Sequence, residues 1–169
     1  IVNAAGIDCP LGVPGELWLR GPSLMHGYWR DPLETARAFD AAGWFATGDI
    51  VRQDEDGFYW IVDRKKDMYI SGGENIFPAE IELVLLEHPD VRECALVGMQ
   101  DSRWGEVGWL AVVPTRDGVR EQALLDWLGQ RIARYKLPTQ VRIVDALPRT
   151  ATGKLQKARL KDMLLGSAG

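Results

Sequence analysis

Five consecutive charged residues near the middle of the 169-residue chain constrain its fold more than any other feature. The run Asp63-Arg64-Lys65-Lys66-Asp67 lies between two segments whose apolar residues follow the pattern of packed strands. A run of this kind is usually a solvated segment rather than part of a core. It therefore predicts a linker between two packed units, residues 1–64 and residues 65–169.

The first unit is predicted to contain strands and one short helix. Gly15–Arg20 alternates as a strand does, and the turn at residues 54–57 joins Ile50–Arg52 to Phe58–Val62 in a hairpin. Asp31 and Pro32 have the positions of an N-cap and of a first helical residue, so we expect a helix from there to about residue 39.

The second unit is predicted to interleave helices and strands, which makes the whole chain α+β. Gly72-Gly73 indicates a turn after a short strand, and residues 147–155 read as a polar loop. The expected strands are Met68–Ser71, Val91–Gly98, Trp109–Pro114 and Val141–Val144, and the expected helices are Pro78–Glu87, Gln122–Ala133 and Gln156–Leu165.

The overall composition excludes several classes of protein. With 46% hydrophobic and 26% charged residues, the chain resembles neither a disordered protein, a collagen-like fibre nor a coiled coil. It has no stretch of about 20 apolar residues, so we expect no membrane span. The two cysteines, Cys9 and Cys94, cannot form a disulfide framework, and no signal peptide is recognisable, which predicts a cytoplasmic protein. Because the chain opens at Ile1 rather than at methionine, we expect it to be a piece of a longer one.

Charge is distributed unevenly along the chain. The formal net charge is −4, yet residues 134–162 hold eight bases and two acids, which leaves −10 for the remainder. A short basic segment on an acidic protein fits a long nucleic-acid footprint poorly, so we expect no nucleic-acid partner.

Seven short motifs occur in one order along nearly the whole chain. They are Gly15–Pro22, Gly27–Trp29, Trp44–Asp49, Asp63–Asp67, Ser71–Ile76, Pro78–Glu82 and Pro148–Lys154. Together they resemble the C-terminal portion of the adenylate-forming superfamily, which includes acyl-CoA synthetases, peptide-synthetase adenylation domains and luciferases.

This resemblance implies an activity and a domain organisation. Members activate a carboxylic acid with ATP, which brings Mg²⁺, to an acyl-adenylate, and most then transfer the acyl group to a thiol such as that of CoA. Residues 1–64 would be the end of the large nucleotide-binding domain, with a β-barrel-like subdomain, and residues 65–169 a small mobile lid. The family's phosphate loop and acid pocket precede anything present here, so we expect this piece alone to be inactive and its partner to be the missing N-terminal domain.

The resemblance also assigns roles to individual residues. Asp49 and Arg64 would bind the nucleotide, and a carboxylate such as that of Asp49 can accept hydrogen bonds from two ribose hydroxyls. Lys66 would be the pivot of the lid, and a lysine here is more typical of fatty- and aryl-acid CoA ligases than of peptide synthetases. Gly72 and Gly73 would line the tunnel for the thiol, because the missing side chains leave room beside the backbone.

Lys154, in the segment Thr152-Gly153-Lys154, is the predicted catalytic residue. By resemblance its ammonium lies between the substrate carboxylate and the α-phosphate, where it would offset the repulsion between two anions. His26 and His88 fit no metal-ligand pattern, so the sequence predicts no metal site.

Two alternatives remain open at this stage. The same fold would serve an adenylation domain that loads a carrier protein instead of CoA. A non-enzymatic module could use the basic segment to bind nucleic acid, in which case binding would fall steeply with salt. The acid substrate is not predictable, because the acid pocket is absent.

Overall fold

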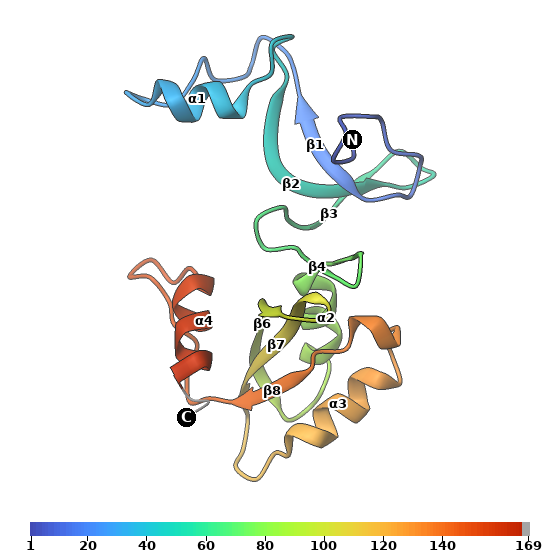
Figure 1. The fold of residues 1–169 in the computed structure, drawn as a ribbon, viewed down its shortest axis with the longest axis vertical. Coiled ribbons are helices and arrows are strands. Elements are labelled where there is room, and N and C mark those ends of the chain that lie inside the picture. The colour runs from blue at the N-terminus through green and yellow to red at the C-terminus, as the bar shows by residue number, and fades with distance from the viewer. Residues whose placement is uncertain (167–169) are drawn as a thin grey trace. The chain divides into compact units, whose positions relative to one another are not determined.

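The computed structural model describes residues 1–166, so residues 167–169 of the predicted second unit lie outside the described part. The chain folds as two compact units, Ile1–Lys66 and a second that begins at Asp67. Figure 1 labels most of the strands and helices of each unit. The assignment of these units to a large domain and a lid stays a prediction.

The first unit is an open antiparallel sheet with one short helix. Its strands are β1 (Gly15–Leu19), β2 (Phe45–Gln53) and β3 (Tyr59–Arg64), in the order β1-β2-β3. Helix α1 (Pro32–Ala38) begins as predicted, because the Asp31 side chain accepts a hydrogen bond of 2.9 Å from the Glu34 amide. Residues 1–66 form no closed barrel.

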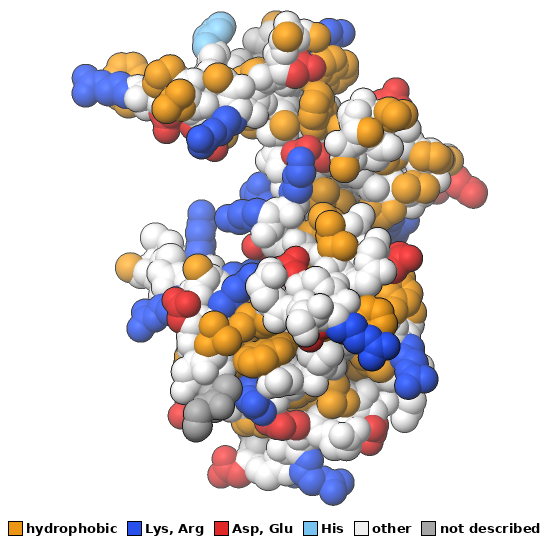
Figure 2. Space-filling view, viewed as in Figure 1, with side chains coloured by type: hydrophobic (Ala, Val, Ile, Leu, Met, Phe, Trp, Pro, Cys, Tyr) orange, Lys and Arg blue, Asp and Glu red, His pale blue; other side chains and the backbone are white. Residues whose placement is uncertain are grey.

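Many large apolar side chains of the first unit are exposed, as the orange atoms of Figure 2 show for one face. The most exposed are Trp29 (87%), Ile61 (76%) and Leu33 (73%). A three-stranded sheet with one seven-residue helix offers little surface to cover them.

The predicted linker at residues 63–67 is wrong for its first two residues. Strand β3 continues through Arg64, which is the register partner of Asp49 in β2, and Asp63 is only 7% exposed. A charged run can therefore extend a strand where the neighbouring strand supplies polar partners. The connection between the two units begins at Lys65.

The second unit is a five-stranded sheet with helices on both faces. The sheet order is β5-β4-β7-β6, and β8 runs parallel to β7 along the edge that β4 also pairs. The elements are β4 (Tyr69–Ser71), β5 (Glu74–Ile76), α2 (Pro78–Leu86), β6 (Val91–Asp101), β7 (Gly105–Pro114), α3 (Glu121–Gly129), the 3₁₀ turn η1 (Arg134–Lys136), β8 (Gln140–Ile143) and α4 (Lys157–Gly166).

Alternation along β6 and β7 builds a separate core on each face of the sheet. Leu96 and Leu110 pack with Ile81 of α2 and Leu128 of α3 in one cluster. The residues next to them in sequence, Val97 and Ala111, point to the other face and pack with Leu160 and Leu164 of α4. Figure 1 shows α4 and α3 on opposite sides of the sheet.

The predicted elements of the second unit are present, with shifted ends. The helix expected at Gln122–Ala133 stops at Gly129, and residues 134–136 form η1 instead. No helix within residues 1–166 is long and apolar enough to span a membrane.

Candidate functional site

The two residues predicted to bind the nucleotide lie side by side in the first unit. Asp49 of β2 and Arg64 of β3 are register partners, and an Arg64 Nη1 atom lies 2.9 Å from Asp49 Oδ1. The Asp49 amide donates to Thr47 Oγ1 over 3.1 Å, near the middle of β2. The Asp49 side chain is 24% exposed, so the pair can meet a ligand from solvent.

The segment that joins the units is anchored by ion pairs on each side of Lys66. Lys65 Nζ lies 2.8 Å from Oε2 of the buried Glu16, within the first unit. Burial alone would raise the pKa of Glu16, but hydrogen bonds from Lys65 and Trp18 outweigh burial and hold that pKa below its ordinary value of 4.5. Lys66 itself is exposed and forms no ion pair with any residue of the described range.

Gly72 and Gly73 form the two-residue loop of the β4–β5 hairpin. Their φ angles are +58° and +89°, as a tight turn with two left-handed residues requires. The Gly72 amide donates to the Trp104 carbonyl over 2.9 Å, and a Cβ at Gly72 would lie 2.9 Å from Trp104 Cε3. Glycine at position 72 thus allows the turn to approach the Trp104 ring.

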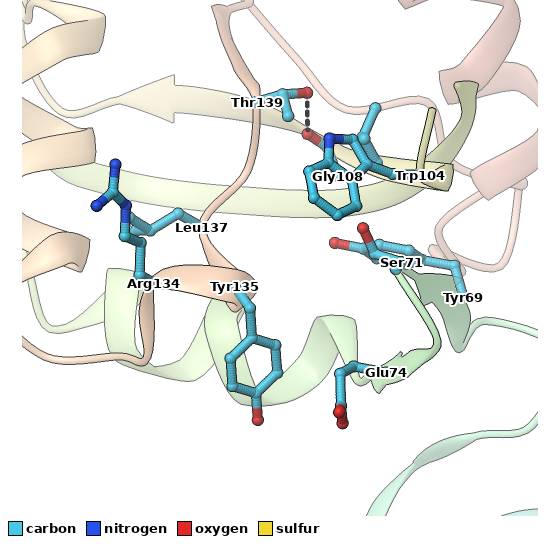
Figure 3. Close-up of a pocket in the computed structure, with 11 residues that line it drawn as sticks. Tyr69, Ser71, Glu74, Trp104, Gly108, Arg134, Tyr135, Leu137 and Thr139 are labelled. Carbon is cyan, nitrogen blue, oxygen red and sulfur yellow. Dashed lines mark hydrogen bonds between the residues drawn. The ribbon is translucent and has the colours of Figure 1, made fainter. Parts of the chain in front are cut away.

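A pocket of about 570 Å³ opens beside Gly72 within the second unit. Figure 3 shows Tyr69, Ser71 and Trp104 on one side of it, and Arg134 and Tyr135 of η1 on the other. Its lining is completed by Gly72, Glu74, Val107, Gly108, Leu137 and Thr139. The pocket lies at the break in the sheet edge, where β4 pairs with Gly105 and β8 pairs only from Trp109 onward.

Sequence reasoning missed the aromatic residues of this pocket. Trp104 is 46% exposed and Tyr135 is 54% exposed, whereas large aromatic rings usually pack. Burial, followed by the charge of Glu106, raises the pKa of Tyr69, so its phenol stays protonated at neutral pH. The only signal in the sequence was the unusual content of seven tryptophans, which does not indicate which of them stay exposed.

Lys154 lies at the end of a tight turn, and hydrogen bonds between its backbone and Thr150 close that turn. The Thr150 amide donates to the Lys154 carbonyl over 2.8 Å, and the Lys154 amide donates to Thr150 Oγ1 over 3.1 Å. Arg149 Nη1 donates to the Gly153 carbonyl over 2.8 Å, while its Nη2 bonds to Glu93 of β6. The Lys154 side chain is exposed, and it has no ion-pair partner among residues 1–166.

The second unit keeps its predicted functional residues apart. Gly72 lines the pocket, but Lys154 is outside that lining and lies in the loop before α4. The described residues contain no cluster of three or more His, Cys, Asp or Glu side chains that could hold a metal ion.

Comparison with known proteins relates this geometry to a family. Residues 80–154 match the model of the AMP-binding enzyme C-terminal domain. An indoleacetate–CoA ligase of Aromatoleum aromaticum is 48% identical over 97% of this chain, and a feruloyl-CoA synthase of an Amycolatopsis species is 46% identical over 95%. These matches cover 32% and 33% of the two relatives, so the chain spans about a third of their length.

Solved structures agree with the sequence comparison. The o-succinylbenzoate CoA synthetase of Bacillus subtilis, determined with its acyl-adenylate intermediate, superposes on 95% of this chain with a TM-score of 0.86 and 38% identity, over 33% of its own length. ATP-bound MatB of Rhodopseudomonas palustris gives a TM-score of 0.87 and 36% identity, with 95% and 32% of the two chains covered. This chain therefore belongs to the adenylate-forming superfamily and corresponds to the C-terminal portion of its members.

Proposed function

We propose that this chain is the C-terminal portion of an ATP-dependent acyl- or aryl-CoA ligase and that Lys154 acts in adenylate formation. The observation that carries the proposal is the exposed Lys154 side chain on a turn closed by three hydrogen bonds. A rigid turn with an exposed ammonium can hold a positive charge in place against a ligand. The names of the most similar relatives, which are CoA ligases, support the same reaction class.

In the adenylation step, a substrate carboxylate attacks the α-phosphorus of ATP and pyrophosphate leaves. Two anions must approach each other, and charge develops on the phosphate oxygens. The Lys154 ammonium would stabilise that charge, an effect on the order of 3 kcal/mol for one well-placed donor. Asp49 would accept hydrogen bonds from the ribose hydroxyls, and Arg64 would hold Asp49 in place and face the phosphates.

In the second step, the thiol of CoA attacks the acyl carbonyl and AMP leaves. The 570 Å³ pocket beside Gly72 supports CoA as the acceptor. Exposed aromatic rings such as Trp104 and Tyr135 can stack on a base, and Arg134 adds a positive charge for phosphate. Lys66 would be the pivot that exchanges the Lys154 side of the lid for the Gly72-Gly73 side, as in other enzymes that move a domain between steps.

The observed ion pairs weaken the nucleic-acid alternative. Of the eight bases between residues 134 and 162, Lys136 pairs with Glu80, Arg149 with Glu93 and Lys157 with Asp67. Such pairing neutralises part of the basic segment.

The decisive experiment replaces Lys154 with Ala in the full-length enzyme and measures the two half-reactions separately. We expect acid-dependent ATP–pyrophosphate exchange to fall on the order of 10²- to 10³-fold, while CoA thioester formation from supplied acyl-adenylate is retained. Lys161→Ala, which removes a lysine from α4, is the matched control and should leave both rates unchanged. Equal loss of both half-reactions in Lys154→Ala would contradict the assignment.

The same assays test two further points: whether the acyl acceptor is CoA or a carrier protein, and whether residues 1–169 are active alone. A carrier protein that replaces CoA as the better acceptor would favour the adenylation-domain alternative. We expect residues 1–169 alone to form no adenylate, because the phosphate loop and acid pocket of the family lie outside this sequence. Adenylate formation by the isolated chain would contradict that expectation.

A further inference from the structure

The ion pairs of the residues before Lys66 lie within the first unit, and the ion pair of the residue after it lies within the second unit. On the amino-terminal side, Arg64 pairs with Asp49 and Lys65 with Glu16, both within the first unit. On the carboxyl-terminal side, Asp67 pairs with Lys157 at 3.6 Å, within the second unit. The residues adjacent to Lys66 are thus each held by an ion pair inside their own unit.

Lys157 lies between two acidic side chains in a partly buried cluster. Its Nζ atom is 3.6 Å from Asp67 Oδ2 and 3.9 Å from Glu82 Oε1, and the three side chains are only 19–22% exposed. Glu82 Oε1 also accepts a 2.7 Å hydrogen bond from the Leu96 amide, which attaches the cluster to β6. Without the Lys157 ammonium, the carboxylates of Asp67 and Glu82 would be left close together in a site with limited water. Their negative charges would then repel each other and favour a larger separation.

The same lysine is close in sequence to Lys154. Lys157 is the first residue of α4, three positions after Lys154, so the cluster adjoins the Lys154 turn. Leu160 and Leu164 bury the apolar side of α4 against the sheet, but apolar burial is non-directional and does not by itself set the orientation of the helix end. The Arg149–Glu93 pair attaches the other end of the turn to β6.

We propose that Lys157 is a positioning residue that ties the segment after the pivot, at Asp67, to the turn that carries Lys154. The proposal rests on the proposed function of Lys154. When the chain turns at Lys66, the Asp67–Lys157 pair makes the Lys154 turn follow the joint as one rigid piece. The Gly72-Gly73 loop is connected to the joint directly through β4 and does not need this pair.

The test compares Lys157→Met, Lys157→Arg and Asp67→Asn in the full-length enzyme, with Arg159→Met as a control that removes a positive charge from an exposed position of α4. We expect Lys157→Met and Asp67→Asn to lower kcat for acid-dependent ATP–pyrophosphate exchange on the order of 10- to 100-fold, because an ångström-scale misplacement of a catalytic group has effects of this size. The KM for ATP and thioester formation from supplied adenylate should stay unchanged. Lys157→Arg should restore the exchange rate, and Arg159→Met should match the parent.

Three results would overturn the proposal: parental exchange in the folded Lys157→Met enzyme, equal loss of both half-reactions, or failure of Lys157→Arg to restore the rate. If Lys157→Met does not fold, Asp67→Asn decides, because it removes the same pair and leaves α4 unaltered. Lys154→Ala is measured in parallel. A normal exchange rate in that variant would refute the proposed function, whereas its selective loss beside a normal Lys157→Met would refute only the positioning role.

Discussion

Replacement of Gly72 and Gly73 by alanine, one at a time, separates two physical costs in the hairpin beside the pocket. Both residues have positive φ, and a left-handed conformation costs an alanine about 1–2 kcal/mol relative to glycine. A Cβ at Gly73 would meet nothing within 4 Å, so Gly73→Ala should show that backbone cost alone. Gly73→Ala is therefore the matched control for Gly72→Ala.

At Gly72 the added methyl group also meets the Trp104 ring, 2.9 Å from Cε3 and 3.2 Å from Cζ3. Overpacking typically costs about 1–3 kcal/mol, and we expect the lower end because the Trp104 ring is 46% exposed and can shift. The second unit should thus lose about 2–3 kcal/mol in Gly72→Ala, roughly 1 kcal/mol more than in Gly73→Ala.

The measurement is hydrogen exchange of the buried amides of β6 and β7, which reports the free energy of opening of the second unit specifically. A double-mutant cycle with Trp104→Ala then isolates the contact, since the excess cost of Gly72→Ala should disappear in that background. Equal losses for the two glycine variants, or an excess that survives in Trp104→Ala, would refute the reasoning.

Three further predictions concern the stability of each unit. Leu160→Ala should destabilise the second unit by about 2–5 kcal/mol, because Leu160 is fully buried. Leu165→Ala, on the exposed side of α4, should cost less than about 0.5 kcal/mol. Urea denaturation of both variants measures the two free energies of unfolding. Asp31→Ala removes the N-cap of α1 and should cost the first unit about 1 kcal/mol, measured as faster hydrogen exchange in α1, while Asp31→Asn should retain most of the stability. Because the folded pKa of Glu16 lies below its ordinary value of 4.5, the Lys65–Glu16 pair should contribute stability above about pH 4.5 that is lost as pH falls below it. Glu16→Gln should flatten this acid limb in urea midpoints taken across that range, and an unchanged limb would contradict the pairing.

The short-range features of the fold were predictable because their causes are local. Asp31 and Pro32 predicted the start of α1, and the Gly72-Gly73 pair predicted a turn that proved to join β4 and β5. Alternation of apolar residues predicted β6 and β7. In the structure β6 continues further, to Asp101, and β7 begins earlier, at Gly105. In each case the residues that decide the conformation lie within a few positions of one another.

The charged run shows where local reasoning fails. Five charges in sequence predict a solvated linker, but Asp63 and Arg64 belong to β3 because β2 supplies Asp49 as a partner across the sheet. Lys65 and Asp67 are likewise held by Glu16 and Lys157, which are 49 and 90 positions away. Periodicity carries no information on pairing at such separations.

The sequence by itself determined the family, the order of most elements and the residue types suited to the proposed chemistry, since these depend on motifs and neighbouring side chains. Only the tertiary structure decided that Trp104 and Tyr135 stand exposed around a pocket beside Gly72. It also decided that Arg64, Lys65 and Asp67 each form an ion pair, whereas Lys66 forms none with the described residues. The physical reason is that exposure and ion pairing depend on which distant elements pack against a residue, and that is set by the sheet order and the two cores rather than by the neighbouring sequence.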